Sequence, residues 1–186
     1  MGLPAKKPAT YEDVLSVPEN LVAQVVNGTL YTHPRPTNRH AMSASMLGAD
    51  LVGPFGKGRG GPGGWLILDE PELHLGGDIL VPDLAGWRRE RLPELPDAPF
   101  IEIAPNWVCE VLSPSTEALD RTEKLAIFAV QGVTHVWFIN PATRTLEVLQ
   151  LDGTTYRVKA THAGDAVVRA EPFDAIELAL SDLWSR

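Results

Sequence analysis

The sequence predicts an α+β fold in which helices flank a mixed central β-sheet. Short apolar runs bounded by Gly, Pro, Asn or Asp recur along the chain, and such runs are typical of strands. A few other segments space their apolar residues as an amphipathic helix does. No internal repeat and no linker-like stretch interrupts this pattern. We therefore expect residues 1–186 to form a single domain.

The N-terminal part predicts a helix followed by a hairpin. Thr10 and Asp13 have the spacing of a capping box, in which each side chain bonds to the other residue's main chain at a helix start. The apolar runs 21–26 and 29–32 flank the pair Asn27-Gly28. Because Asn-Gly adopts the tight turn that joins two antiparallel strands, we expect a β-hairpin here.

The middle of the chain predicts a helix, a loop and a series of strands. Asn38 is a candidate cap for a helix through Leu51, which places Met42, Met46 and Leu47 on one face. Seven glycines between positions 53 and 64 predict a loop, which lacks the spacing of a phosphate-binding Walker motif. A meander is expected at 65–68, 72–75 and 79–84, then a proline-rich surface excursion over 88–105 and a buried strand over 107–112.

The C-terminal part predicts one more helix and three strands. The sequence Asp120-Arg121-Thr122-Glu123 fits a capping box, so a helix is expected from Asp120 to about Val130, where Gly132 ends it. The strands are expected at 136–139 and in a hairpin formed by 146–151 and 155–158.

Composition excludes several classes of protein. The net charge of −8 argues against a protein that coats DNA nonspecifically, because phosphate binding needs a positive surface. It does not exclude a nuclease, since acids at a metal site add to the negative total. Cys109 is the only cysteine, so no intrachain disulfide forms, and we expect Cys109 to be a core residue. Without a signal-peptide pattern or a long apolar run, we expect a cytoplasmic protein with no membrane contact.

Two acidic residues stand inside apolar runs. Asp83 follows a proline in the run 79–84, and Glu110 lies in the run 107–112. Burying a carboxylate among such residues costs several kcal/mol unless it is paired or binds a metal. Lys124 follows on the expected helix. Asp, Glu and Lys are the residue types needed for metal-assisted attack by water on a phosphodiester. The alternatives are a turn residue for Asp83, a solvated edge acid for Glu110, and a solvated lysine paired with Asp120 for Lys124.

The order of these motifs resembles the Uma family, which is placed in the PD-(D/E)XK nuclease superfamily. The resemblance extends from about Tyr11 to Trp184. It implies a restriction-endonuclease-like core. In such proteins a lysine usually stands two residues after the strand acid. Here that position is Leu112, and the lysine is Lys124 on the following helix. The motifs are Pro82-Asp83, Glu-Val-Leu-Ser-Pro-Ser-Thr over 110–116, Asp120-x-x-x-Lys124, and Gly132-Val133-x-x-Val136-Trp137-x-x-Asn140-Pro141.

The resemblance also implies an activity and a set of site residues. It implies a DNA endonuclease that uses Mg²⁺ or Mn²⁺, with Asp83, Glu110 and the main-chain carbonyl of Val111 as metal ligands. Lys124 would orient or deprotonate the attacking water, or stabilise the developing charge. Gln24 stands where the family has an acid, and an amide is a weaker metal ligand than a carboxylate. By analogy, the partner is DNA and the enzyme is a homodimer.

Several auxiliary residues have two interpretations each. His40, where the family often has a histidine, either contacts a phosphate and tunes the site or has a structural role. Glu70 either completes the acid cluster or ends a hairpin. The basic cluster Arg88, Arg89 and Arg91 either meets a DNA backbone or is solvated on a loop. Asp120 is expected to cap its helix rather than to bind metal.

Two other functions compete with a nuclease. The first is a catalytically inactive nuclease-fold module for DNA association or protein interaction, which Gln24 and the negative charge favour. The second is a metal-binding hydrolase of a smaller phosphate ester. Zinc is not expected, because the histidines lack the spacing of zinc ligands and a lone cysteine cannot build a thiolate site.

Overall fold

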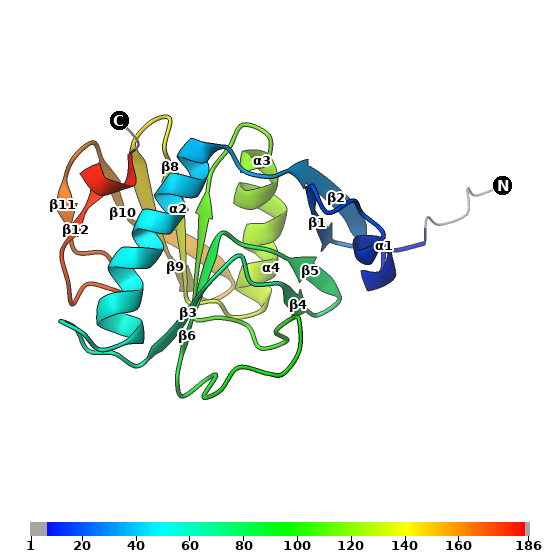
Figure 1. The fold of residues 1–186 in the computed structure, drawn as a ribbon, viewed down its shortest axis with the longest axis horizontal. Coiled ribbons are helices and arrows are strands. Elements are labelled where there is room, and N and C mark those ends of the chain that lie inside the picture. The colour runs from blue at the N-terminus through cyan, green and yellow to red at the C-terminus, as the bar shows by residue number, and fades with distance from the viewer. Residues whose placement is uncertain (1–6, 185–186) are drawn as a thin grey trace.

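A large mixed sheet forms the centre of the molecule in the computed structural model, which describes residues 7–184 (Figure 1). Its strand order is β10-β9-β8-β7-β6-β3, and only the pair β7–β8 is parallel. The mixed sheet with flanking helices confirms the predicted α+β class. Its strands are β3 (Trp65–Asp69), β6 (Leu84–Arg88), β7 (Trp107–Val111), β8 (His135–Asn140), β9 (Thr145–Asp152) and β10 (Thr155–Ala163).

A smaller four-stranded sheet stands beside it with the order β2-β1-β5-β4, on the right of Figure 1. Asn27 and Gly28 adopt the positive φ angles of the predicted hairpin turn. The short helix α1 (Tyr11–Leu15) starts with the predicted capping box of Thr10 and Asp13. The strands are β1 (Leu21–Val26), β2 (Thr29–Pro34), β4 (Leu73–Leu75) and β5 (Asp78–Leu80).

The predicted meander is wrong, because the chain changes sheets twice. After β3 it enters the small sheet as β4 and β5, and it then returns to the large sheet as β6, which pairs with β3. Residues 81–83 form the bend between the two sheets. Pro82 has no amide hydrogen to continue a strand ladder, which favours a break at this point. Asp83 therefore lies just before β6 rather than inside a longer strand.

Helix α2 (Asn38–Leu51) has a different cap and a different buried face from those predicted. Thr37 is the cap, and its hydroxyl accepts a hydrogen bond from the main-chain N–H of His40 at 3.4 Å. Met42 is exposed. The helix continues into a π-helical turn over Val52–Gly56, so the glycine-rich loop starts later than expected. The buried residues of α2 are Ser43, Ala44, Leu47 and Leu51.

The second long helix begins earlier than predicted. It consists of α3 (Glu117–Leu119), a π-helical turn over Asp120–Lys124, and α4 (Leu125–Val130), which Figure 1 shows as one continuous helix. The predicted start at Asp120 is wrong, because this residue lies inside the helix with its side chain paired to Lys124. Gly132 ends the helix with a positive φ, as expected.

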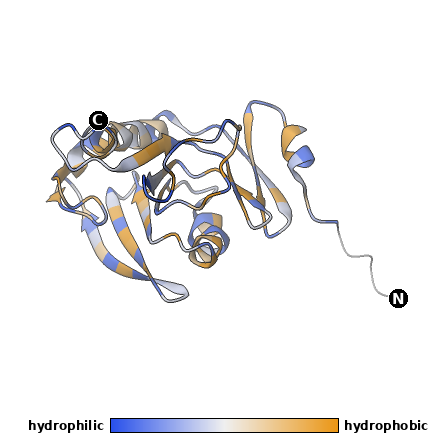
Figure 2. Cartoon of the chain, turned by 90° about the horizontal axis from the view of Figure 1, so that it is seen from below, coloured by the Kyte–Doolittle hydropathy of each residue, from blue (hydrophilic) through white to orange (hydrophobic). Residues whose placement is uncertain are grey.

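The C-terminal part contains the predicted hairpin and one element that was missed. Figure 2 shows hydrophilic and hydrophobic residues alternating along the long hairpin of β9 and β10. A two-stranded sheet follows, formed by β11 (Val167–Val168) and β12 (Leu178–Ala179), with a 3₁₀ turn over Leu180–Leu183. Among the residues that the structure describes, no helix has both the length and the apolar character needed to cross a membrane.

The helices α2 and α4 cover opposite faces of the large sheet. One core cluster joins α2 to Cys109 and Val111 of β7, and the other joins α4 to Val108. Because side chains alternate along a strand, Glu110 shares its face with Val108 and points toward α4. Cys109 is buried on the opposite face, as predicted.

An aromatic cluster fills the core under α2. Phe173 is fully buried, and its ring centroid lies 4.7 Å from that of Phe55, 4.8 Å from Trp65, 4.9 Å from Trp107 and 5.7 Å from Trp137. These residues come from the π-helical turn after α2, from β3, β7 and β8, and from the C-terminal segment. Phe173 therefore attaches that segment to the large sheet.

We expect Phe173→Ala to lower the free energy of unfolding by about 3–5 kcal/mol, because it removes a buried ring and leaves a cavity. The melting temperature should fall by roughly 10 °C for a chain of this size. Thermal melting by circular dichroism measures the change. The exposed Val130, replaced by alanine, is the control and should melt close to wild type. A Phe173→Ala protein that melts like this control would contradict the packing described here.

Candidate active site

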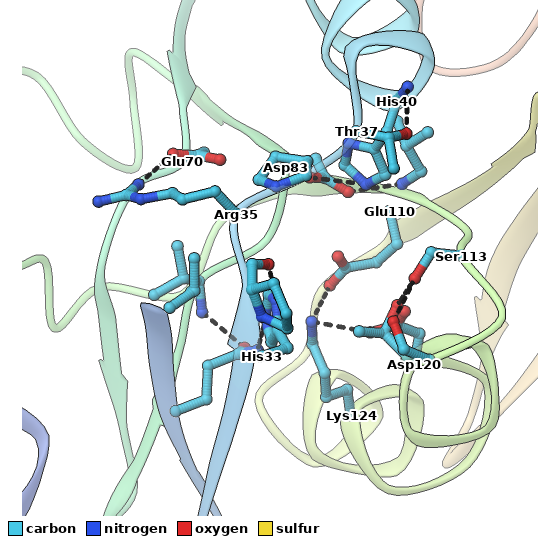
Figure 3. Close-up of a pocket in the computed structure, with 18 residues that line it drawn as sticks. His33, Arg35, Thr37, His40, Glu70, Asp83, Glu110, Ser113, Asp120 and Lys124 are labelled. Carbon is cyan, nitrogen blue, oxygen red and sulfur yellow. Dashed lines mark hydrogen bonds and ion pairs between the residues drawn. The ribbon is translucent and has the colours of Figure 1, made fainter. Parts of the chain in front are cut away.

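Asp83 and Glu110 come together at the junction of the two sheets. In the antiparallel pair β6–β7, Leu84 lies opposite Cys109, so the same register continued by one residue places Asp83 opposite Glu110. Both side chains line a pocket of about 230 Å³. Figure 3 shows the two carboxylates directed toward the space above Lys124. The two acids therefore line the same pocket, and their binding of a single ion stays a prediction.

Asp83 is held by bonds to two different elements. Its Oδ2 accepts a hydrogen bond from the main-chain N–H of Val111 on β7 at 2.6 Å. Its Oδ1 lies 3.3 Å from Nε2 of His40 on α2 (Figure 3). The carboxylate therefore connects the bend before β6 with the end of β7 and the first turn of α2.

His40 is an ion-pair partner of Asp83. Burial alone would lower the pKa of this histidine, but the hydrogen bond and the charge of Asp83 outweigh burial and raise the pKa. The main chain of Val111 and the charge of Glu70 contribute in the same direction. The protonated form of His40 is thus stabilised beside a candidate ligand.

Lys124 is buried rather than solvated, with 1% of its surface exposed. Its Nζ lies 2.7 Å from Oε1 of Glu110 and 3.0 Å from Oδ1 of Asp120. Burial disfavours the charged lysine, but the two carboxylates outweigh burial and raise its pKa, so Lys124 keeps its charge. Pairing with Asp120 was one interpretation of the sequence. The second partner, Glu110, brings the lysine into the pocket.

Glu110 is buried on a central strand. Burial raises the pKa of its carboxyl group well above the ordinary value, and Lys124 acts in the opposite direction. Asp120 and Asp83 are close enough to raise this pKa further. In the absence of a metal, the negative charge of Glu110 is therefore stabilised mainly by Lys124.

Gln24 reaches the pocket, but its amide group is already engaged. Its Oε1 accepts a hydrogen bond from the main-chain N–H of Val81 at 2.9 Å. Its Nε2 must therefore face Nε2 of His33, 3.3 Å away, which then accepts. The His33 proton is left on Nδ1, 3.1 Å from the carbonyl oxygen of Pro34. Gln24 thus connects β1 to the bend before β6.

Glu70 lies at the rim of the pocket. Its main-chain N–H donates to the carbonyl oxygen of Asp83 at 3.0 Å, and its φ angle is positive. Its carboxylate is turned toward Arg35, with Oε2 lying 3.6 Å from the guanidinium (Figure 3). The main chain of Glu70 is therefore next to Asp83, while the carboxylate of Glu70 is paired with Arg35.

The basic cluster Arg88, Arg89 and Arg91 lies away from the pocket. Asp83 immediately precedes β6 and Arg88 is the last residue of β6, so the two are separated by roughly 16 Å at 3.3 Å per residue. Arg88 lies over the ring of Trp65. Arg89 and Arg91 bond to main-chain carbonyl oxygens of the following loop. The structure does not bring these arginines together with the candidate site.

Several pocket residues were missed by sequence reasoning. Ser113, Ser115 and Thr116 form a cluster of hydroxyl groups with two oxygen separations of 3.0 Å. These residues stood within a recognised motif, which was a usable signal. Arg35 also lines the pocket and carried no signal in the sequence. Within residues 7–184, no three His, Cys, Asp or Glu side chains form a group that could hold a metal ion.

Comparison with protein families identifies the chain. The family Uma2, described as “Putative restriction endonuclease”, matches residues 8–181. The chain belongs to the Uma2 family. This membership confirms the resemblance noted from the motifs. The comparison with curated proteins finds no match.

A solved structure has the same fold as this Uma2 chain. It is described as “a putative nuclease belonging to DUF820” from Anabaena variabilis, and it is 22% identical in sequence. The similarity covers 95% of this chain and 98% of that chain, with a TM-score of 0.75. The two chains therefore share their fold along almost their whole length.

We expect Lys124→Met to destabilise the metal-free protein by about 3–5 kcal/mol near neutral pH, because two buried carboxylates lose their shared cation. The loss should shrink toward about pH 5. Lys124 lowers the pKa of Glu110, so without Lys124 folding raises this pKa further, and the folded variant binds more protons than wild type. Its deficit in stability therefore grows as pH rises above the unfolded pKa of Glu110.

Urea unfolding of both proteins between about pH 5 and pH 8, with a chelator present, measures this dependence. The exposed Lys57, for which the structure shows no ion pair, is replaced by methionine as the control and should unfold close to wild type at every pH. A pH-independent deficit in the Lys124 variant would contradict the pairing with Glu110.

Proposed function

We propose that this protein is a Mg²⁺-dependent DNA endonuclease-like phosphodiester hydrolase that uses Asp83, Glu110 and Lys124. The observation that carries the proposal is the placement of two carboxylates opposite one another in one pocket, with a buried ammonium 2.7 Å from Glu110. Membership of a family described as restriction endonucleases supports the reaction class and DNA as the substrate. A homodimer, which would cut two strands, stays a prediction.

The residues of the pocket fit Mg²⁺ or Mn²⁺. Mg²⁺ usually binds through one or two carboxylates and keeps several waters, so a set of three protein side chains is not required. Asp83 and Glu110 would hold the ion, with the main-chain carbonyl of Val111 as a further proposed ligand. When bound, the ion supplies positive charge that activates water and neutralises charge on the phosphate.

Lys124 is the proposed catalytic cation. Its ammonium has three donors, of which one faces Glu110 and one faces Asp120. The third donor is available to orient the attacking water or to stabilise charge on the phosphate. Because Asp120 lies one helical turn before Lys124, it fixes the direction of the ammonium toward the pocket.

Two specific observations favour the inactive-module alternative. The oxygen of Gln24 is taken by the main-chain N–H of Val81, so it has less capacity to bind a cation. Lys124 also occupies one oxygen of Glu110, and an incoming cation must share that oxygen or displace the lysine. A hydrolase of smaller phosphate esters would use the same groups, so substrate assays must separate these functions.

We expect wild type to nick supercoiled plasmid DNA with Mg²⁺ or Mn²⁺ and not with a chelator. Asp83→Asn and Glu110→Gln should nearly abolish nicking, because they preserve shape but remove the charge that holds the ion. The exposed Asp165, replaced by asparagine, is the control and should nick at the wild-type rate. Parallel assays use single-stranded DNA and a small phosphodiester, and calorimetry measures cation binding.

Each result assigns one function. Nicking that survives in Glu110→Gln would reveal a contaminating nuclease or a different site. Cation binding without cleavage of any of these substrates would favour the inactive module. Cleavage of the small ester alone would favour the phosphate-ester hydrolase.

We expect Lys124→Ala to reduce the cleavage rate by roughly 10²–10⁴ if the lysine acts on the attacking water. The variant is destabilised, so the rate is measured at a temperature where circular dichroism shows it folded. Cation affinity, measured by calorimetry, should be equal or higher, because a competing positive charge next to Glu110 is gone. A folded variant that cleaves at the wild-type rate would remove Lys124 from the mechanism.

A further inference from the structure

A second hollow adjoins the candidate active site. It is a groove of about 610 Å³ between the segment around α1 and strand β1. Four residues line both hollows, so the groove continues the pocket rather than forming a separate cavity. The shared residues are Val22, Arg35, Glu70 and Val81.

We propose that this groove binds a nucleobase of the DNA strand, and that Arg35 at its entrance binds the adjoining phosphate. The proposal rests on the proposed function, since it takes DNA as the substrate. The pocket of about 230 Å³ is small for more than one phosphate and its attacking water. A strand that enters it must continue over the neighbouring surface, and the groove is a hollow that shares residues with the pocket.

Arg35 stands where the two hollows meet. Its side chain is 60% exposed, and one nitrogen donates to the carbonyl oxygen of Glu19 at 3.3 Å. Its contact with Glu70 is long, at 3.6 Å. Figure 3 shows its guanidinium directed away from Lys124 and next to Glu70. A guanidinium has five donors in a planar fork, so Arg35 has donors left for phosphate oxygens.

The walls of the groove suit the flat, apolar faces of a base. Leu15 is 67% exposed, although it is a large apolar residue, and it lines the groove with Val17, Pro18 and Leu21. Single exposed apolar residues are common on protein surfaces, but here several gather in one hollow next to a candidate active site. Every base has such a face, so contact of this kind tolerates different sequences.

The charges of the groove fix the orientation of the nucleotide. Glu19, Glu70 and Glu72 also line it, and their carboxylates repel a phosphate. The same carboxylates can accept hydrogen bonds from the amino groups of bases. The phosphate therefore lies at Arg35, on the boundary between the hollows, and the uncharged base enters the groove.

Fluorescence anisotropy of a labelled single-stranded oligonucleotide of roughly 12 nucleotides tests the inference, with Ca²⁺, which also takes oxygen ligands, in place of Mg²⁺ and salt varied from about 50 to 200 mM. The full chain is used as wild type, Arg35→Ala and Leu15→Ser. Arg157→Ala and Val130→Ser are matched controls, because both residues are exposed on other elements. The same titrations use an abasic oligomer of equal length.

We expect Arg35→Ala to weaken binding about tenfold and to reduce the salt slope by about one, on both oligomers. Leu15→Ser should weaken binding of the normal oligomer by about threefold to tenfold at an unchanged slope, through lost apolar contact. It should not change binding of the abasic oligomer. Both controls should bind like wild type.

Three results would overturn the inference, and they differ in whether they also exclude the proposed function. If wild type binds neither oligomer, DNA as the substrate falls and the inference falls with it. If wild type binds but Arg35→Ala and Leu15→Ser behave like their controls, only the groove is excluded, and the plasmid assay still decides the proposed function. If Leu15→Ser weakens both oligomers equally, the groove contacts the backbone and not a base.

Discussion

The buried ion pairs of Lys124 are the interaction on which the rest of the site depends. Glu110 lies in the middle of the large sheet, where an unpaired carboxylate would cost several kcal/mol. Lys124 comes from the helix packed on that face and also pairs with Asp120 of the same helix, so its pairing with Glu110 couples helix and strand. A hydrophobic residue at position 110 would give the same burial without this need. The arrangement is therefore better explained by the chemistry of the pocket than by stability.

The break at Pro82 places the small sheet along one side of the pocket. Because residues 81–83 lead from the small sheet into the large one, the small sheet is fixed beside the ends of β6 and β7. Gln24 strengthens this junction through the main-chain N–H of Val81, and Asp83 does so through that of Val111. The pocket is thus formed by two sheets and two helices. A change in the small sheet would alter the direction of Asp83 without touching a candidate ligand.

Local signals in the sequence predicted most of the strands and singled out Asp83 and Glu110. They failed for the features that depend on contacts between distant parts of the chain. The Asn-Gly turn, the capping box at Thr10 and the buried run around Glu110 each act within a few residues. The change of sheet after β3 depends on pairing between distant strands, so a simple meander was predicted. Asp120 looked like a helix cap because Glu110, the other partner of Lys124, is close to the helix only in the folded chain. Arg35 had no local signal.

The charge of the pocket bears on how an acidic chain could act on the proposed DNA substrate. Four carboxylates line it, from Glu70, Asp83, Glu110 and Asp120, against two permanently charged cations, Arg35 and Lys124. His40 adds at most one positive charge, and Nε2 of His33 accepts a hydrogen bond from Gln24, so the carboxylates stay in excess. A phosphate that approaches the metal-free pocket therefore meets net negative charge. A divalent cation reverses that sign locally. Such a site should favour the cation before the phosphate, so the negative net charge of the chain and a phosphodiester substrate are compatible.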